Sequence, residues 1–385
     1  MAFDITEYLD KLPPIPLPGM KSNESIGIDI GSASLKIVQL KGGPGKYQLV
    51  RWSVIPLAGP VDAEKPDKAE MSPEEKRTAA TNLLKNYRGS GKGIPKNAVA
   101  SVSGGSVIVR YVKFQKLTRK ELSKTIKVEA EPYIPFNIEE VYIGFHTLQD
   151  VMDEGKPKME TVLVAAKQDQ VNQRVEILEG AGFKAAVVDV DAFALESVYD
   201  AAFPVAPEET VLIANIGHTQ TNFVIIDKGL SIVVKDSLVS GNSINKAIVK
   251  NLGVDAKTSE KLKQTHGLLV NPQEKEAALN EGKKEAVGVS NAIASVAKDL
   301  ITEIKKLIEF YAMQGAERQV NRVIISGGSS NIKNLVPLLS KELNLPVEKL
   351  NPFIGIAGAE GVPDEYQATL GVAVGLAMRR PGDVK

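Results

Sequence analysis

The chain of 385 residues contains no cysteine. Disulfide bridges, thiolate metal sites and thiol nucleophiles are therefore excluded, and the composition suits a reducing, intracellular compartment. Charge of either sign is not in excess, because 47 Lys and Arg residues balance 47 Asp and Glu residues. A balanced chain does not have the basic surface that nucleic acids or anionic membranes attract, so we expect neither as a direct partner.

Long apolar runs are also missing, and no stretch approaches the roughly 18 apolar residues of a membrane-spanning helix. The first 20 residues are acidic and rich in proline, unlike the basic and then apolar start of a signal peptide. The prolines of residues 11–20 predict a stiff, extended segment, which could equally be a tail or partner-binding peptide, or a segment packed on the protein. We therefore expect a soluble cytoplasmic protein.

Two segments repeat one pattern, in which two apolar strands flank a short polar turn with glycine. The first is 26–40, IGIDIGSASLKIVQL, and the second is 210–229, TVLIANIGHTQTNFVIIDKG. A third strand follows each of them, at 47–57 and at 230–239. The shared pattern predicts an internally duplicated α/β protein with two lobes.

Between the two repeats, residues 106–190 alternate strands and helices in the order β-α-β-β-α-β, which predicts an inserted unit. Its first helix, from Thr118 to Glu131, opens with a Thr-x-x-Glu capping box, and an earlier helix is capped at Ser72. In the second half we expect helices at 241–252, 290–313 and 366–378.

Three glycine turns each follow a strand, at residues 29–32, 215–218 and 326–329. Glycine lets backbone N–H groups approach a phosphate or a ribose without interference from a Cβ atom. One such turn alone is typical of an ordinary hairpin. Two matching hairpins followed by a strand, Gly-Gly and a helix predict a phosphate-binding site.

These turns resemble the motifs of the actin-like ATPase superfamily. Asp29-x-Gly31-Ser32-x-Ser34-x-Lys36 resembles the first phosphate motif, Asn215-x-Gly217-x-Thr219-x-Thr221 the second, and Ser326-Gly327-Gly328-Ser329 the adenosine motif. Within this superfamily the chain resembles the PilM family of type IV pilus assembly, which is similar to the division protein FtsA. The resemblance spans roughly residues 24–380, and the segments that carry it are 26–40, 106–114, 128–148, 161–167, 180–195 and 259–267.

The resemblance implies a two-lobed, actin-like α/β fold, of the duplicated ribonuclease H-like kind, with an inserted α+β subdomain of the FtsA type. It implies a proline-rich tail at 1–23 and four subdomains: 1A at 24–103 with 184–207 and 362–385, 1C at 104–183, 2A at 208–246 with 319–361, and 2B at 247–318.

The resemblance also implies a site for ATP or ADP with Mg²⁺. Asp29 would reach the metal through water, and Lys36 would neutralise a phosphate. Phosphate contacts would come from the two turns, that is from Gly31, Ser32, Ala33, Ser34, Asn215, Gly217, His218, Thr219, Gln220 and Thr221. The cleft and the adenosine would be lined by Gly241, Asn242, Asn245, Glu260, Lys263, Gly327, Gly328 and Ser329.

One departure bears on activity, because the second phosphate motif usually opens with aspartate and here has Asn215. Asparagine keeps the oxygen but loses the charge that would hold a metal-bound water. The residue that positions the attacking water would be Glu196 or Asp191. We therefore predict nucleotide binding with at most slow hydrolysis.

PilM relatives hold the N-terminal cytoplasmic peptide of the membrane protein PilN between the first domain and the inserted one. In this chain the cleft would lie near Arg110 and Phe114 and near Tyr133 and Phe136, although the last two are equally typical of a core. The resemblance also implies pilus motor ATPases and a platform protein as partners, and homo-oligomers.

The last residues, 375–385, contain no long amphipathic segment. We therefore expect the protein to reach the inner face of the cytoplasmic membrane only through its partners. Two other functions share this fold: a metabolite kinase, and an actin-like protein that forms filaments.

Overall fold

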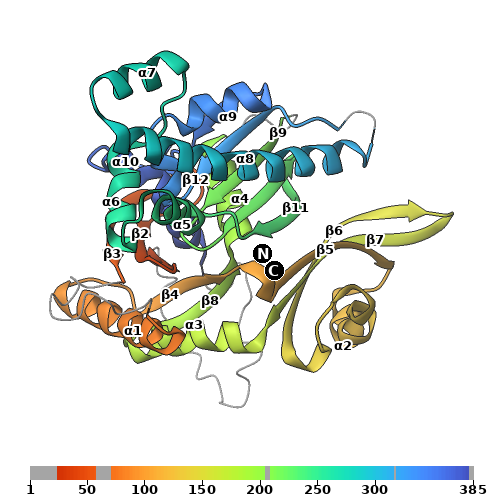
Figure 1. The fold of residues 1–385 in the computed structure, drawn as a ribbon. Helices are drawn as coiled ribbons and strands as arrows, with labels where there is room; N and C mark the ends of the chain where they lie inside the picture. The colour runs from red at the N-terminus through yellow and green to blue at the C-terminus, as the bar shows by residue number, and fades with distance from the viewer. Residues whose placement is uncertain (1–23, 58–70, 204–208, 316–317, 381–385) are drawn as a thin grey trace. The chain divides into compact units, whose positions relative to one another are not determined.

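A computed structural model describes residues 24–57, 71–203, 209–315 and 318–380 (Figure 1). The proline-rich tail predicted at 1–23 lies outside these residues. The chain divides into two compact units. Unit 1 contains Met1–Ser197, Ile356–Gly358 and Val372–Lys385, and unit 2 contains Val198–Gly355 and Ala359–Gly371.

Unit 1 is built on a five-stranded sheet of order β3-β2-β1-β4-β8. Its strands are β1 Glu24–Ile30, β2 Ser34–Lys41, β3 Gln48–Pro56, β4 Asn97–Val102 and β8 Lys184–Val190. The first three form an antiparallel meander, whereas β4 runs parallel to β1 and β8 parallel to β4. The carboxyl ends of β1, β4 and β8 therefore meet at one edge, where open α/β sheets commonly bind ligands.

Helices cover both faces of this sheet. On one face α1 (Pro73–Ser90) and α3 (Gln168–Gly180) enclose a core with Ile26, Ile28 and Ile30 of β1. The predicted cap of α1 is present, since the Ser72 hydroxyl accepts a hydrogen bond from the Glu75 N–H and the Glu75 carboxylate accepts one from the Ser72 N–H.

The opposite face is covered by two helices that pack very closely where the chain has glycine. A Cβ atom on Gly27 would lie 2.3 Å from the Ala373 carbonyl oxygen, so α11 (Gly371–Met378) packs directly on the backbone of β1. A Cβ atom on Gly375 would lie 1.9 Å from the Ala194 carbonyl oxygen, so α11 is equally close to α4 (Asp191–Ala202). Only residues without side chains permit these contacts.

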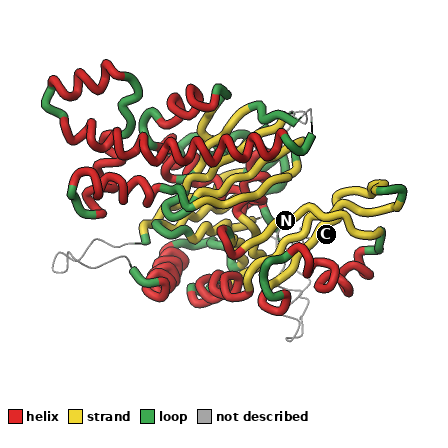
Figure 2. Tube along the Cα trace, turned by 45° about the vertical axis from the view of Figure 1, so that its right-hand side comes forward, coloured by secondary structure: helices red, strands yellow, loops and turns green. Residues whose placement is uncertain are grey.

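The chain between β4 and α3 forms a smaller sheet of order β5-β7-β6, which Figure 2 shows beside one helix. This sheet and its helix have a hydrophobic core of their own. Its elements are β5 Val107–Gln115, α2 Arg119–Ala130, β6 Val141–Asp153 and β7 Lys156–Lys167. The expected capping box of Thr118 and Glu121 is confirmed. All six elements of the predicted β-α-β-β-α-β series occur, but α3 packs in the larger core and β8 pairs with β4, because both carry apolar side chains that this core buries.

Unit 2 repeats the plan, with a sheet of order β11-β10-β9-β12-β13. Its strands are β9 Thr210–Ile216, β10 Thr221–Asp227, β11 Leu230–Ser237, β12 Arg322–Ser326 and β13 Val347–Lys349. Again the first three strands, β9 to β11, form an antiparallel meander. The β12 strand runs parallel to β9, and β13 runs parallel to β12. The predicted duplication is therefore confirmed in strand order and direction.

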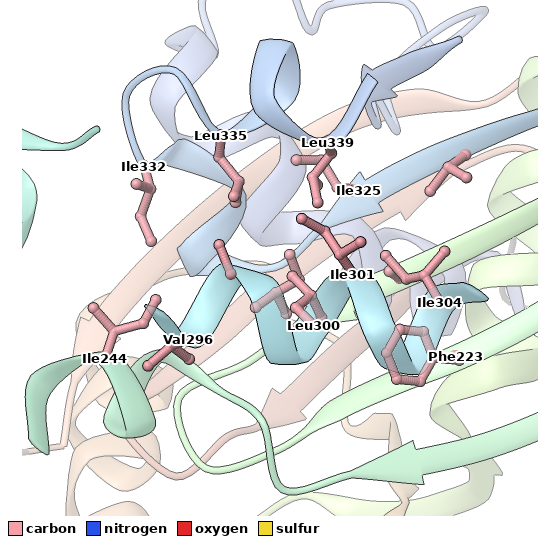
Figure 3. Close-up of a cluster of buried hydrophobic side chains, with 14 of the residues drawn as sticks. Phe223, Ile244, Val296, Leu300, Ile301, Ile304, Ile325, Ile332, Leu335 and Leu339 are labelled. Atoms are coloured by element: carbon pink, nitrogen blue, oxygen red, sulfur yellow. The ribbon is translucent and has the colours of Figure 1, made fainter. Parts of the chain in front are cut away.

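The helices of unit 2 are α5 Gly241–Leu252, α6 Ala256–His266, α7 Pro272–Asn280, α8 Lys284–Ala312, α9 Leu335–Leu343 and α10 Asp364–Gln367. The α8 helix begins at Lys284 rather than at Ser290 as predicted. Its apolar stripe, which includes Leu300 and Ile304, meets β12 and α9 in the buried cluster of Figure 3. This stripe is the core face that the three- and four-residue spacing predicted.

The single helix predicted at 366–378 is instead divided into α10, a 3₁₀ turn at Ala368–Leu370 and α11. The physical reason lies at Ala368, whose carbonyl oxygen accepts hydrogen bonds from the Ser326 hydroxyl at 2.8 Å and from the Gly327 N–H at 2.9 Å. Other 3₁₀ turns are at Gly104–Ser106, Glu131–Tyr133, Ile138–Glu140 and Gly328–Asn331.

Candidate functional site

The hairpin loop of unit 1 joins β1 and β2 through Gly31, Ser32 and Ala33. The Gly31 N–H donates to the Ser34 carbonyl oxygen at 3.2 Å. A Cβ atom on Gly31 would lie 2.6 Å from the Lys36 ammonium nitrogen, so glycine makes room for that side chain. Sequence pattern predicted this turn, and the structure explains its glycine by crowding.

Lys36 is paired with Asp29, directly opposite on the neighbouring strand. Their charged atoms are 3.0 Å apart, and each side chain is only 15% exposed. Because β2 lies between β1 and β3, Lys36 is not an edge charge in water. The sheet therefore presents one ammonium and one carboxylate, mutually neutralised, beside the glycine loop.

Asp191 lies at the same edge of the sheet, where the carboxyl ends of β1, β4 and β8 meet. The Ser101 hydroxyl, at the end of β4, donates to the Asp191 carboxylate at 2.5 Å. The register of β1 with β4 pairs Gly27 with Val99, which brings Ser101 level with Asp29. Asp191 comes directly after β8, so Asp29, Ser101 and Asp191 lie within one residue of the carboxyl ends of three adjacent parallel strands.

Arg174 of α3 is a further member of this group, and sequence reasoning missed it. Its Nε donates to the Ser101 carbonyl oxygen at 3.1 Å. Burial lowers the pKa of Arg174, and the nearby carboxylates of Asp191 and Asp29 oppose that shift. No local motif marks this arginine, since only the tertiary fold carries α3 to the strand ends.

Glu196, the other candidate for positioning a water, lies further along α4 and faces different groups. Burial raises the pKa of Tyr111 above its ordinary value, and the carboxylates of Glu196 and Glu160 raise it further. Asp191 therefore shares Ser101 and Arg174 with the Asp29 hairpin, whereas Glu196 lies near Tyr111 of β5.

The hairpin loop of unit 2, Gly217 to Gln220, is built in the same way as its counterpart. The Gly217 N–H donates to the Gln220 carbonyl oxygen at 2.9 Å, and a Cβ atom on Gly217 would lie 2.8 Å from that oxygen. Thr221, the first residue of β10, donates its hydroxyl to the Val239 carbonyl oxygen at 2.6 Å. Hydrogen bonds therefore hold both ends of this loop.

The N-terminus of α5 supports this loop. The Gly241 N–H donates to the Gly217 carbonyl oxygen at 2.9 Å, and the Asn242 N–H donates to the His218 carbonyl oxygen at 2.7 Å. These two amides would otherwise have no partner inside the helix. A Cβ atom on Gly241 would lie 2.6 Å from the Ser329 hydroxyl, so the predicted second phosphate and adenosine motifs are brought together.

The Gly-Gly turn after β12 differs at its two positions. Gly327 has φ of +82°, and a Cβ atom there would lie 2.6 Å from the Ile216 carbonyl oxygen and 2.8 Å from the Asn215 side-chain oxygen. A Cβ atom on Gly328 would have no atom within 4 Å. Gly327 is therefore required by the fold, whereas Gly328 leaves open space beside the turn.

Glu260 and Lys263 on α6 form a charged cluster with α5. The Lys263 ammonium lies 2.7 Å from the Glu260 carboxylate and donates to the Gly241 carbonyl oxygen at 3.4 Å. The amides of Asn245 and Gln264 also donate to Glu260, at 2.7 and 2.8 Å. Burial raises the pKa of Glu260, but Lys263 and these hydrogen bonds outweigh it, so the pKa lies below its usual value.

Asn245 is buried, and its side-chain oxygen has no hydrogen-bond partner. Its amide nitrogen is already used by Glu260. A buried oxygen of this kind gains stability when it accepts a hydrogen bond.

The four residues predicted for partner binding lie on the smaller sheet and its turn. Phe114 is buried in the core and meets the Tyr133 ring edge to face, with centroids 6.1 Å apart. Tyr133 is 41% exposed. Phe136 packs partly against the same core under the Lys167 ammonium, and Arg110 is exposed. Surface contact is therefore open to Tyr133, Arg110 and part of Phe136.

Within the described residues, no group of three or more His, Cys, Asp or Glu side chains is placed so that it could hold a metal ion. In the same part of the chain, no helix has the length and apolar character needed to cross a membrane.

The fold is similar to those of several solved structures. The ethanolamine utilization protein EutJ from Carboxydothermus hydrogenoformans has a TM-score of 0.52 at 11% identity, with 94% of this chain and 91% of that chain covered. MreB5 of Spiroplasma citri, solved with bound AMPPNP, has a TM-score of 0.52 at 13% identity, with 92% and 95% covered. With its duplicated sheets and glycine hairpins, the chain has the fold of an actin-like protein.

A more specific similarity is to the structure of a PilM–PilN type IV pilus biogenesis complex. It has a TM-score of 0.75 at 25% identity, with 94% of this chain and 99% of that chain covered. The family model of type IV pilus assembly protein PilM matches residues 27–381. The chain therefore belongs to the PilM family, and it is an actin-like protein of type IV pilus assembly.

Proposed function

We propose that this chain is a nucleotide-binding scaffold of the type IV pilus assembly platform, which binds the N-terminal cytoplasmic peptide of PilN. The observation that carries the proposal is the similarity over 94% of the chain, at a TM-score of 0.75, to the PilM–PilN complex. Through PilN the protein would reach the inner face of the cytoplasmic membrane, where the pilus motor ATPases and the platform protein are its further proposed partners.

The proposed ligand is ATP or ADP, and the donor sets of both units fit it. Lys36 offers an ammonium for phosphate beside the N–H groups of the Gly31 loop, and phosphate oxygens favour such charged donors. In unit 2, Glu260 offers a carboxylate for ribose hydroxyls, Asn245 an unused oxygen and Gly328 open space. Each unit by itself thus offers groups of the kind that a nucleotide needs.

Mg²⁺ would accompany the nucleotide, with Asp29 as the carboxylate nearest the phosphates. Magnesium keeps several waters and uses substrate phosphates as ligands, so one carboxylate acting through water suits it. Bound Mg²⁺ would neutralise phosphate charge and orient a water. The positive charge of Arg174 would interact favourably with the carboxylates of Asp29 and Asp191 in this buried region.

Hydrolysis, if the protein performs it, would be slow because Asn215 has no charge. Of the two candidates for positioning a water, we favour Asp191, since it shares Ser101 and Arg174 with the Asp29 hairpin. Nucleotide would then act chiefly as a regulator of the scaffold.

The nucleotide proposal is tested by equilibrium binding of labelled ATP to the wild type and to Lys36→Ala. Lys41→Ala is the matched control, since Lys41 is an exposed lysine on the same strand. We expect the first variant to lose affinity at least tenfold and the second to bind normally. Equal binding by all three proteins would refute the assignment of Lys36.

The partner proposal is tested by calorimetric titration of a PilN N-terminal peptide. Tyr133→Ala and Arg110→Ala are expected to weaken binding, because both side chains are exposed on the proposed surface. Met152→Ala, an exposed apolar residue on the β6–β7 hairpin, is the control. Unchanged affinity in the first two variants would remove this surface from the proposal.

A further inference from the structure

A row of polar side chains crosses the sheet of unit 2 just before the Gly217 loop. Asp236 of β11, Asn222 of β10, Asn215 of β9 and Ser326 of β12 occupy directly opposed positions on neighbouring strands. Directly opposed residues project from the same face of a sheet and interact. We call these four residues the polar row.

Hydrogen bonds link three members of the polar row, Asn215, Asn222 and Asp236, in one direction. The hydroxyl of the fourth, Ser326, donates to the Ala368 carbonyl oxygen. The Asn215 amide nitrogen donates to the Asn222 oxygen at 3.2 Å, and the Asn222 amide nitrogen donates to the Asp236 carboxylate at 2.5 Å. The oxygen of Asn215 is left on the side of Gly327, where a Cβ atom would lie 2.8 Å from it. The second phosphate motif therefore presents an oxygen, and not a nitrogen, beside the Gly-Gly turn.

This direction follows from the chemistry of the last member. An ionised carboxylate only accepts hydrogen bonds, so the Asn222 amide must turn its nitrogen toward Asp236. Its oxygen then faces Asn215, whose nitrogen must donate to it. Asn222 is buried, and a reversed amide there would face Asp236 oxygen to oxygen, at the cost of a lost hydrogen bond and a repulsion.

The need of the Asn222 amide for one donor and one acceptor neighbour also limits which positions of the polar row can have a carboxylate. A buried amide between two carboxylates would have to turn its oxygen toward one of them. Positions 215 and 236 flank Asn222, so the polar row accepts a carboxylate at one of these two positions but not at both. In this chain the carboxylate is at position 236, and position 215 has the neutral side chain.

We infer that Asp236 is a positioning residue of the second phosphate motif, which fixes both amides so that the Asn215 oxygen faces the nucleotide and which excludes a carboxylate at position 215. The role toward nucleotide rests on the proposed function, whereas the coupling between the two positions does not.

Four proteins test this inference: the wild type, Asn215→Asp, Asp236→Asn, and the double variant that exchanges the two groups. The melting temperature is measured without nucleotide, and the dissociation constant is measured for ATP with Mg²⁺. The control for loss of charge is Asp227→Asn. It removes a carboxylate from the last residue of β10, the end of that strand away from the polar row.

We expect Asn215→Asp to lower the melting temperature, because the Asn222 oxygen then faces a carboxylate. Asp236→Asn frees the amides to reverse, so the affinity for ATP is expected to fall about tenfold, the equivalent of one hydrogen bond. The double variant is expected to recover both properties, since a reversed Asn222 amide donates to the new carboxylate at position 215 and accepts from the new amide at position 236. The control variant is expected to bind ATP as the wild type does.

Additive effects, with the double variant as impaired as the two single changes together, would overturn the inference. If Asn215→Asp does not fold, a folded double variant is itself the expected rescue, and a double variant that also fails to fold overturns it. Should the wild type bind no nucleotide while the melting temperatures still show rescue, the proposed function fails and the coupling within the polar row stands.

Discussion

The pair of Glu260 and Lys263 allows a prediction of stability with a definite dependence on pH. Lys263 is 6% exposed in its side chain and Glu260 is 37% exposed. Removing one partner of a fully buried pair costs about 3–5 kcal/mol, because the other charge is left unpaired. Water reaches the exposed part of Glu260, so we expect Glu260→Gln to lower the free energy of unfolding by about 2 kcal/mol at pH 7.

The dependence on pH follows from the lowered pKa of Glu260, whose ordinary value is 4.5. A carboxyl with a lowered pKa in the folded state contributes its full stability above the ordinary value, and loses it as the pH falls through the folded value. The difference between the wild type and Glu260→Gln should therefore be constant near neutral pH and shrink in acid below 4.5.

Urea unfolding followed by far-UV circular dichroism measures this difference at pH 7 and in acid. The double variant Glu260→Gln, Lys263→Met is expected to be more stable than Glu260→Gln, because no buried ammonium is left unpaired. A loss below about 0.5 kcal/mol, which is typical of an exposed ion pair, would refute the reasoning. So would a double variant that is no more stable than the single one.

Three further changes test the fold and the site. Gly375→Ala is expected to prevent folding of unit 1, seen as rapid limited proteolysis, because the new Cβ atom would lie 1.9 Å from the Ala194 carbonyl oxygen. Arg379→Met should cost about 3–5 kcal/mol in urea unfolding, since Arg379 lies 2.7 Å from the fully buried carboxylate of Asp189; an effect under about 1 kcal/mol would contradict this. Arg174→Met should weaken binding of ATP with Mg²⁺ at least tenfold while Arg174→Lys recovers part of it, and equal affinities would contradict a role for this charge.

Several features follow from the sequence by itself, because they depend on neighbours along the chain. Alternation and turn chemistry predicted both glycine hairpins, and capping boxes at Ser72 and Thr118 fixed where two helices begin. The apolar spacing of Leu300 and Ile304 predicted the core face of α8. The order of the three glycine motifs indicated an actin-like protein. The PilM family, to which the chain belongs, was indicated by other segments, such as 128–148.

Element ends were less predictable where distant groups decide them. The helix expected at 366–378 is interrupted at Ala368. Its carbonyl oxygen accepts hydrogen bonds from Ser326 and Gly327, which lie some forty residues earlier in the chain. The α3 helix was expected with the inserted unit, yet its apolar face packs in the larger core of unit 1. Sequence pattern gives the apolar face of an element but not the core that receives it.

The chemistry of the candidate site was likewise predictable from the sequence only in part. The sequence by itself determined that Asp29, Gly31 and Lys36 stand at a hairpin and that position 215 lacks a charge. Only the tertiary structure brought Arg174 to the ends of three parallel strands, and only strand register aligned Asp236 with Asn215. The physical reason is that a hairpin is a local structure, whereas the electrostatic environment of its residues is set by whatever the rest of the chain packs beside them.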